Sequence, residues 1–346
     1  MIKEIEILRP SDMHVHFRDG DQLSFTVNES SKNFNYIIAM PNLSPPILSF
    51  KEAINYYERI VSVNKFSDFS PLVTIFLSLN LTKEDIEESS KDPRIAGVKL
   101  YPNGVTTNSR SNINGLQEVY QVLEMLEKFD LPLLVHGEST KKNLDIFDRE
   151  KYFIDDLEAV VRKFPNLRIV FEHISTKEAV SFVKESSNKI AATITPQHMI
   201  LNRNDLLSGG IKPHNYCLPI LKREEHRAAI CEAAVSGSEK FFLGTDSAPH
   251  FKKDKESSCG CAGVFSAHAA LELYVAKFEE LGKLENLEKF TSLNSCKFYN
   301  LEKPKSTLVL EKKEYLIPGS FEVGGQTLIP FLSGEKIDWQ IRNKSL

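Results

Sequence analysis

Short apolar segments rich in β-branched and aromatic residues return along this chain at a regular spacing, and this regularity constrains its fold more than any other feature. The stretches between them place apolar residues three and four positions apart, which is typical of amphipathic helices. Alternating strands and helices indicate a parallel sheet with crossover helices. Because the strands are apolar almost throughout, as in sheets buried on both faces, eight of them favour a closed (β/α)8 barrel, a TIM barrel of the α/β class, over an open sheet. The predicted strands are Ile5–Leu8 leading into Met13–Phe17, Tyr36–Met40, Val73–Leu79, Gly97–Tyr101, Leu133–His136, Arg168–His173, Ile190–Thr195 and Phe241–Gly244.

The length of the chain suits one domain. It has 346 residues, whereas a barrel of this kind needs roughly 250. From about residue 305 the sequence changes to short β-like runs separated by Pro and Gly. We predict a single domain over 1–346, in which about 305–346 form a C-terminal appendage of strands and loops packed on the barrel. The predicted helices are Lys51–Val63, Leu116–Phe129, Asp155–Phe164, Lys177–Glu185, Arg223–Val235, Ala267–Glu280 and Leu284–Tyr299.

Composition and charge argue against several classes of protein. The net charge is −4 and there is no basic tail or stripe, so no nucleic-acid partner is expected. No apolar run approaches the roughly 20 residues that span a bilayer, and we find no secretory signal, so no membrane association is expected. An odd number of cysteines without a signal indicates free thiols in a reducing cytoplasm. Cys259 and Cys261 are close in sequence, and we interpret them as thiols on a tight loop rather than as half of a zinc site.

The first barrel strand carries a polar residue at every second position of the segment DMHVHFRDG. Residues two apart share one face of a strand. The polar face is formed by Asp12, His14, His16 and Arg18. The apolar face, which we expect to pack under the surrounding helices, is formed by Met13, Val15 and Phe17. Two histidines and an acid that point into a barrel cost free energy unless they are hydrogen-bonded or bind something.

Ionisable residues recur at the C-terminal ends of other predicted strands. In a barrel these ends converge on one mouth, where active sites lie. The set brought together there is His14, His16, Lys99, His136, His173 and Asp246. Any one of them alone is more often a structural residue, but five of the eight strands repeat the pattern. Imidazole and carboxylate donors suit zinc, and also manganese, cobalt or nickel.

Lys99 is the unexpected member of this set, because an ammonium group is repelled by a divalent cation. A buried lysine can lose its proton as its pKa falls. A neutral amine can then add CO2, and the resulting carbamate could bridge two metals. The residues alone leave this open beside a snorkelling lysine or an anion clamp.

Seven segments, taken in their order and spacing, closely resemble the dihydroorotases of the shorter, stand-alone bacterial type (class II). The resemblance covers about residues 8 to 300. His-x-His alone would indicate only the wider amidohydrolase superfamily, whereas His-x-His-x-Arg together with GTDSAPH is highly specific. The segments are DMHVHFRDG, GVKLYPNGVTTNS, LLVHGE, FEHIS, ITPQH, GGIKPHNYCLPILKREEHR and GTDSAPHFKKDKESSCGCAGVF.

The resemblance implies reversible cyclisation of N-carbamoyl-L-aspartate to L-dihydroorotate with loss of water, the third step of de novo pyrimidine (UMP) synthesis, in a cytoplasmic homodimer. It implies two zinc ions per subunit, which lower the pKa of a bound water so that it is a nucleophile at neutral pH. The implied ligands are His14, His16 and Asp246 for one zinc, His136 and His173 for the other, and carboxylated Lys99 as the bridge. Asp246 would also be the catalytic general acid and base.

The substrate is an anion, so a site in this acidic protein needs local donors. Arg18 offers a planar fork for a carboxylate, and Asp12, on the same face, is expected to support one of the histidines. The substrate-binding set that the resemblance implies is His16, Arg18, Asn42, His136, Leu218, His250 and Ala262. It also implies that Thr106 and Thr107 belong to a lid over the site, although the residues alone fit an ordinary solvated loop equally well.

The alternative function is another cyclic-amide hydrolase of the same superfamily, a hydantoinase or an allantoinase. Fold and metal site do not separate these activities. Arg18 does, because hydantoin substrates carry no carboxylate for an arginine to bind.

Overall fold

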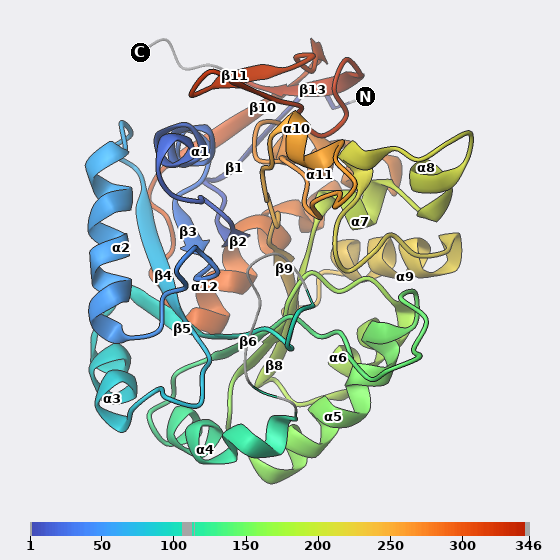
Figure 1. Cartoon of the computed structure of the whole chain (residues 1–346). Helices are drawn as coiled ribbons and strands as arrows, with labels where there is room; N and C mark the ends of the chain where they lie inside the picture. The colour runs from blue at the N-terminus through green and yellow to red at the C-terminus, as the bar shows by residue number, and fades with distance from the viewer. Residues whose placement is uncertain (1, 106–112, 114, 343–346) are drawn as a thin grey trace.

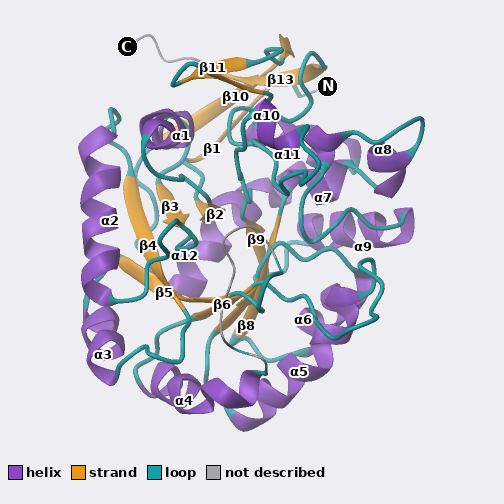
Figure 2. Cartoon of the chain, in the orientation of Figure 1, coloured by secondary structure: helices purple, strands orange, loops and turns teal. Residues whose placement is uncertain are grey.

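The computed structural model describes residues 2–105, 113 and 115–342, and it contains the predicted TIM barrel. Eight parallel strands form one sheet in chain order from β2 to β9, and helices surround it (Figures 1 and 2). A barrel strand lies in each of the eight predicted segments. Their bounds are β2 (Asp12–Val15), β3 (Tyr36–Ala39), β4 (Ser70–Phe76), β5 (Ile95–Leu100), β6 (Leu133–Val135), β7 (Ile169–Phe171), β8 (Ile190–Ile194) and β9 (Phe241–Leu243).

The barrel closes between β2 and the segment that follows β9. Val15 and Ser247 form a parallel bridge there. The amide of Asp246 donates to the carbonyl of His14 at 2.9 Å, and the amide of His16 donates to the carbonyl of Ser247 at 3.0 Å. The closing hydrogen bonds therefore hold the first and last predicted metal-binding segments in register.

The helices lie on the outside of the sheet. The predicted helix Lys177–Glu185 has the predicted ends, the other predicted helices are present with shifted ends, and Leu284–Tyr299 is divided into a 3-10 turn, a π-helical turn and α12. α5 begins earlier than predicted, and α1, α3 and the short helices α7, α8 and α10 were not predicted. None of the described helices combines the length and apolarity that crossing a membrane requires. The bounds are α1 (Asp21–Ser31), α2 (Phe50–Val63), α3 (Lys83–Lys91), α4 (Tyr120–Lys128) after a 3-10 turn at Leu116–Val119, α5 (Arg149–Lys163), α6 (Lys177–Glu185), α7 (Pro196–Ile200), α8 (Arg203–Leu207), α9 (Glu224–Val235), α10 (Lys252–Lys255), α11 (Ala270–Glu280) and α12 (Asn294–Tyr299).

Separate apolar clusters cover the two faces of the barrel sheet. The outer face, with Val15 and Phe17, packs against the helices. The inner cluster takes a residue from every strand and is closed by Tyr299 of α12; its strand members are Met13, Ile38, Leu72, Ala96, Leu134, Val170, Ala191 and Phe242. The prediction that Met13 packs under the helices is therefore wrong. The pairing of β2 with β3 is irregular between Asp12 and Val15, so strict alternation of faces fails there.

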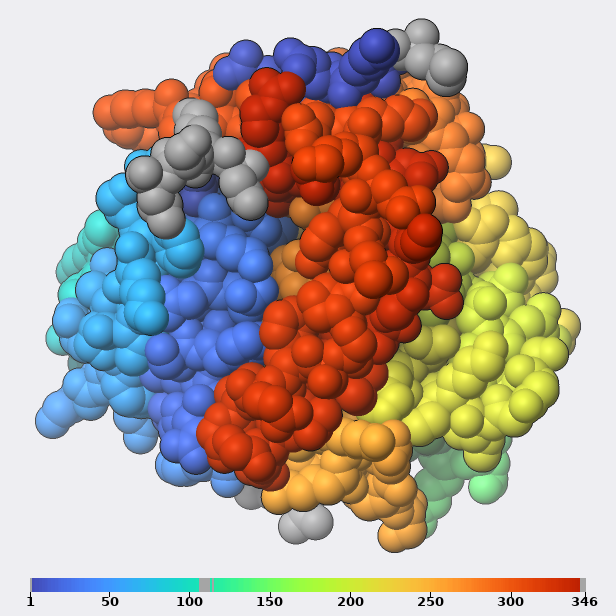
Figure 3. All heavy atoms as spheres, turned by 90° about the horizontal axis from the view of Figure 1, so that it is seen from above, coloured from blue at the N-terminus to red at the C-terminus, as the bar shows by residue number. Residues whose placement is uncertain are grey.

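Ile5–Leu8 does not continue into the barrel as expected. It forms β1 (Glu4–Leu8), which pairs with β10 (Thr307–Leu316) in a separate antiparallel sheet of order β1-β10-β13, completed by β13 (Lys336–Ile341). A hairpin of β11 (Phe321–Val323) and β12 (Gln326–Leu328) precedes β13. Seen from above, the C-terminal residues form a red band between the blue and yellow-green parts of the chain (Figure 3). Buried Trp339 of β13 donates from Nε1 to Glu279 of α11 at 2.9 Å, which ties this sheet to the helices.

Candidate active site

The carboxyl ends of the barrel strands meet at a cavity that collects most of the predicted site residues. His14 lies in β2 and Lys99 in β5, and the other predicted ligands follow β2, β6, β7 and β9. The predicted metal ligands that line the cavity are His16, His136, His173 and Asp246. His14 and Lys99 lie directly behind them and are buried. The sheet therefore brings the predicted ligands to one place.

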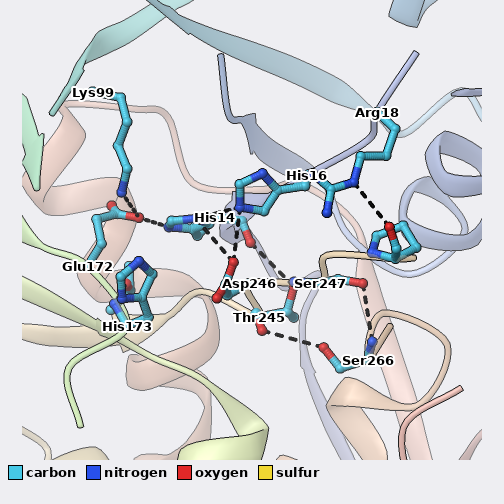
Figure 4. A network of polar contacts seen from close by, with 12 residues as sticks. His14, His16, Arg18, Lys99, Glu172, His173, Thr245, Asp246, Ser247 and Ser266 are labelled. Carbon is cyan, nitrogen blue, oxygen red and sulfur yellow. Dashed lines mark hydrogen bonds and ion pairs between the residues drawn. The ribbon is translucent and has the colours of Figure 1, made fainter. Parts of the chain in front are cut away.

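Three of these residues form a ready donor group. The Nε2 atoms of His14 and His16 are 3.3 Å apart, and they lie 3.4 Å and 3.1 Å from Oδ1 of Asp246 (Figure 4). Burial holds the pKa of both histidines below the ordinary value, so the rings are neutral and present lone pairs. Neutral imidazoles and a carboxylate at this spacing suit a divalent metal. Within the described part of the chain, this is the group of His, Cys, Asp and Glu residues that could hold an ion.

Glu172 supports this group, and the sequence reasoning missed it. Its carboxylate contacts Nδ1 of His14, the ring nitrogen that faces away from Asp246, and it lies 3.6 Å from Nζ of Lys99 (Figure 4). A carboxylate on the second nitrogen of a histidine fixes the tautomer and orientation of the ring. An acid directly before His173 in FEHIS was the available signal, because a fully buried acid near histidines needs partners of this kind.

Lys99 is fully buried, and its Nζ has no hydrogen-bond partner among the described residues. Burial lowers its pKa well below the ordinary value, which favours the neutral amine. Nζ lies 5.1 Å from the centre of the Tyr101 ring, and Tyr101, which was not predicted, also lines the cavity. A buried amine that makes no hydrogen bond is the kind of group that addition of CO2 would convert into a carboxylate donor.

His136 and His173 face each other on the opposite side of the cavity, with ring centres 4.6 Å apart. Nδ1 of His173 is buried without a hydrogen-bond partner in the described structure. Nε2 of His136 lies 2.8 Å from the carboxylate of Glu138, a residue that was not predicted either. Nδ1 of His136 therefore remains as its ligand atom. These histidines and Lys99 fit a second metal by the chemistry of their donors.

Asp12 was expected to support one of the histidine rings, but its carboxylate contacts the backbone and Thr245 instead. Its carboxylate accepts hydrogen bonds from the amide of Thr245 at 2.8 Å and from its hydroxyl at 2.6 Å, and a longer one from the amide of His14 at 3.3 Å. It thus fixes the turn that carries Asp246. A Cβ added at Gly244 would lie 2.7 Å from Cβ of Thr193, so the glycine permits this close packing.

Three site residues have a left-handed backbone, with φ of 63° at Arg18, 41° at His173 and 47° at Asp246. For residues other than glycine this conformation costs free energy and persists only where the surroundings enforce it. The barrel therefore bends the chain sharply just past the strands and aims these side chains into the cavity.

The predicted substrate contacts form the remaining wall. Arg18, Asn42, Leu218 and Ala262 line the cavity. Arg18 donates from Nε to the carbonyl of Pro249 at 3.1 Å, and its Nη2 lies 2.9 Å from Nε2 of His250. Burial and the positive charge of Arg18 lower the pKa of His250 to about 2, so His250 is neutral. Thr106 and Thr107, the predicted lid residues, lie outside the described residues.

Comparison with known proteins extends over nearly the whole chain. Residues 11–313 match the amidohydrolase family. The dihydroorotase of Aliivibrio salmonicida is 47% identical over 339 residues, which cover 98% of this chain and 99% of the relative.

Solved structures give the same result. The dihydroorotase of Saccharomyces cerevisiae, in complex with 5-fluoroorotic acid, has a TM-score of 0.92 at 32% identity, with 99% of both chains covered. The dihydroorotase of Campylobacter jejuni has a TM-score of 0.91 at 35% identity, again over 99% of both chains. The L-hydantoinase of Arthrobacter aurescens is more distant, with a TM-score of 0.81 at 15% identity over 99% of this chain and 85% of that one, and it shares the fold alone.

Proposed function

The chain belongs to the dihydroorotases of the amidohydrolase family, and we propose that its cluster of histidines, Lys99 and Asp246 interconverts N-carbamoyl-L-aspartate and L-dihydroorotate on two zinc ions. The dihydroorotase activity rests on the identity of 47% over 98% of the chain. The observation that carries the mechanism is the buried donor group of His14, His16 and Asp246 at the mouth of the barrel.

The two metals would be held by different sides of the cavity. His14, His16 and Asp246 would bind one, His136 and His173 the other, and carboxylated Lys99 both. Metals bound there would supply a hydroxide nucleophile at neutral pH and would polarise the ring carbonyl of dihydroorotate. Nζ of Lys99 and Nδ1 of His173 support this assignment. Each is a buried polar atom that has no hydrogen-bond partner among the described residues, and a bound ligand would provide one.

Asp246 is placed to move the proton. When the ring opens, its carboxylate accepts the proton of the nucleophile and gives it to the leaving ring nitrogen. In cyclisation it removes a proton from the carbamoyl nitrogen, and water is lost. The hydrogen bonds between Asp12 and Thr245 fix the turn that carries Asp246, so the Asp246 carboxylate would have the same position in ring opening and in cyclisation.

Arg18 would bind the carboxylate of the substrate, together with Asn42, His250 and the backbone at Leu218 and Ala262. His16 and His136 would contact the substrate as well as a metal, since both line the cavity. The resemblance implies that Thr106 and Thr107, which lie outside the described residues, belong to a lid. Arg18 is only partly exposed to solvent, so an anion there gains a stronger paired contact than it would on the open surface.

The larger organisation follows from the family. We propose that residues 1–346 form one domain, that the chain works as a homodimer, and that it acts in the cytoplasm. The contacts of β10 and β13 with the barrel helices support the single domain, since Leu308, Leu310 and Trp339 belong to the same apolar cluster as the outer face of the barrel.

Activity with two substrates tests the proposal. The purified chain, supplied with zinc and bicarbonate, should turn over dihydroorotate and leave hydantoin almost unchanged. Absence of turnover with dihydroorotate would overturn the assignment, and equal turnover of hydantoin would favour the alternative cyclic-amide hydrolase.

Replacement of Arg18 tests the carboxylate contact. Arg18→Ala should raise KM for dihydroorotate by about tenfold or more, the scale of a hydrogen bond to a charged group, while zinc content stays near that of the parent. Zinc content is measured by elemental analysis of the same preparations. Loss of zinc would mean that Arg18 holds the metal site instead.

A further inference from the structure

Lys255, at the end of the short helix α10, makes three hydrogen bonds to the backbone. It belongs neither to the predicted metal ligands nor to the predicted substrate contacts. Its side chain is buried, with 3% exposed. Nζ donates to the backbone carbonyls of Tyr216 at 2.8 Å, Cys261 at 2.9 Å and Gly263 at 2.6 Å. An ammonium group has three donors, so all of them are used on the backbone.

The three carbonyls belong to the two segments that form the substrate wall. Leu218 lies two residues after Tyr216, and Ala262 lies between Cys261 and Gly263; Leu218 and Ala262 both line the cavity. The amide of Gly263 also donates to the carbonyl of Tyr216 at 2.9 Å, which joins the two segments. Lys255 therefore holds both parts of the wall from behind.

The hydrogen bond from Lys255 to the carbonyl of Cys261 fixes the orientation of the peptide group between Cys261 and Ala262. A trans peptide is planar, so the carbonyl of Cys261 and the N–H of Ala262 point in opposite directions. Because this carbonyl points at Nζ, the N–H of Ala262 points away from Lys255. Ala262 lines the cavity, and a backbone N–H on a cavity wall is a donor that a bound carboxylate can use.

Lys240 offers an instructive comparison within the same chain. Its Nζ also donates to three backbone carbonyls, those of Val183, Lys184 and Ser186. These lie at the C-terminus of α6, where carbonyls lack partners within the helix and a lysine is a common cap. The carbonyls at Lys255 lie in loops instead, so a cap of a helix end does not account for them.

We propose that Lys255 is a positioning residue for the substrate, whose ammonium group locks the Tyr216–Leu218 and Cys261–Gly263 segments so that the N–H of Ala262 is aimed at the substrate carboxylate. This rests on the proposed function, because that function supplies the carboxylate. Lys255 touches neither the metal ligands nor the reacting atoms. Its removal is expected to weaken substrate binding and to leave the metals in place.

The test compares Lys255→Met with Lys240→Met, which loses the same number of backbone contacts away from the site. Both variants are purified with zinc and bicarbonate, and KM, kcat, zinc content and the Kd for 5-fluoroorotic acid are measured. Lys255→Met should raise KM and Kd by about tenfold or more, with kcat reduced less and zinc unchanged. Lys240→Met should keep the KM and Kd of the parent.

Equal KM and Kd in the two variants would overturn the proposal, as would loss of zinc from Lys255→Met. If Lys255→Met does not fold, Lys255→Gln keeps two N–H donors and should show a smaller rise in KM; a parental KM in Lys255→Gln together with a parental Kd would then overturn the proposal. Failure of the proposed function is distinguished by the parent chain, which would itself not turn over dihydroorotate.

Discussion

At the scale of single residues, Glu172 links the metal ligands to the lysine. It contacts Nδ1 of His14 and lies near Lys99 in a fully buried position. Replacement by glutamine keeps the size but removes the charge that orients the ring of His14. Glu172→Gln should weaken metal affinity by about 10–100-fold, measured by competition with a chelator. Glu185→Gln, on the exposed end of α6, is the control, and equal affinity in both variants would remove the orienting role.

Lys99 has a separate chemical signature. Lys99→Ala removes the proposed carbamate bridge, so zinc content and activity should fall together, and short carboxylic acids should restore part of both. The measurement is zinc content and kcat with and without added acetate or propionate. Full activity of Lys99→Ala without any added acid would contradict the bridging role.

The residues that could be predicted from the sequence share one property. His14, His16, Lys99, His136, His173 and Asp246 are ionisable residues at the ends of apolar strands, where a polar residue stands out. Glu172, Glu138, Tyr101 and Lys255 were missed because each acts through another side chain or through the backbone. Such roles depend on distances between segments far apart in the chain. The position of Glu172 directly before His173 was a signal in the sequence, whereas no spacing marks the role of Lys255.

At the scale of elements, the barrel strands were predicted, whereas α1, α3 and the short helices α7, α8 and α10 were not. The eight strand segments are apolar runs, and burial on both faces leaves that pattern in the sequence. α1 and α3 are rich in polar residues and present a narrow apolar face, so periodicity alone does not mark them. α3 is marked instead by its capping box, in which Thr82 and Asp85 exchange hydrogen bonds. The prediction that Ile5–Leu8 leads into the barrel was wrong, because this segment pairs with β10, which lies far away in the sequence.

Glu150 joins two elements beside the site. On α5, its buried carboxylate accepts hydrogen bonds from the amides and hydroxyls of Ser175 and Thr176, at the start of α6 and just after His173. Glu150→Ala leaves these buried donors without a partner and should lower the free energy of unfolding by roughly 3 kcal/mol. Denaturant unfolding measures it, with Glu158→Ala on the exposed face of α5 as the control. A loss as small as that of the control would show that water replaces the carboxylate.

At the scale of the whole molecule, the second sheet makes stability depend on pH through Glu272 of α11. Its side chain is 5% exposed, and burial raises its pKa to about 7 from an ordinary 4.5. The folded state thus disfavours the ionised form, so this contribution to stability is fully present below about pH 4.5 and is lost as pH rises through 7.

Glu272→Gln removes this dependence. Its gain in stability over the parent should be small at pH 5 and reach about 3 kcal/mol above pH 8, which corresponds to the shift in pKa. Thermal unfolding across this range measures the gain, and Glu280→Gln on the exposed end of the same helix is the control. A gain that does not change with pH would contradict the assignment to this carboxyl group.

The pairing of β1 with β10 also sets an order of events during synthesis. Glu4 lies opposite Glu311, and Leu8 opposite Thr307, so β1 is synthesised well before the strand with which it pairs. The barrel can close earlier, because β2 needs only the segment after β9. Until then the edge of β1 stays unpaired, and unpaired edges invite association between nascent chains. Even after its barrel has closed, the growing chain therefore keeps one unpaired strand edge until β10 has been synthesised.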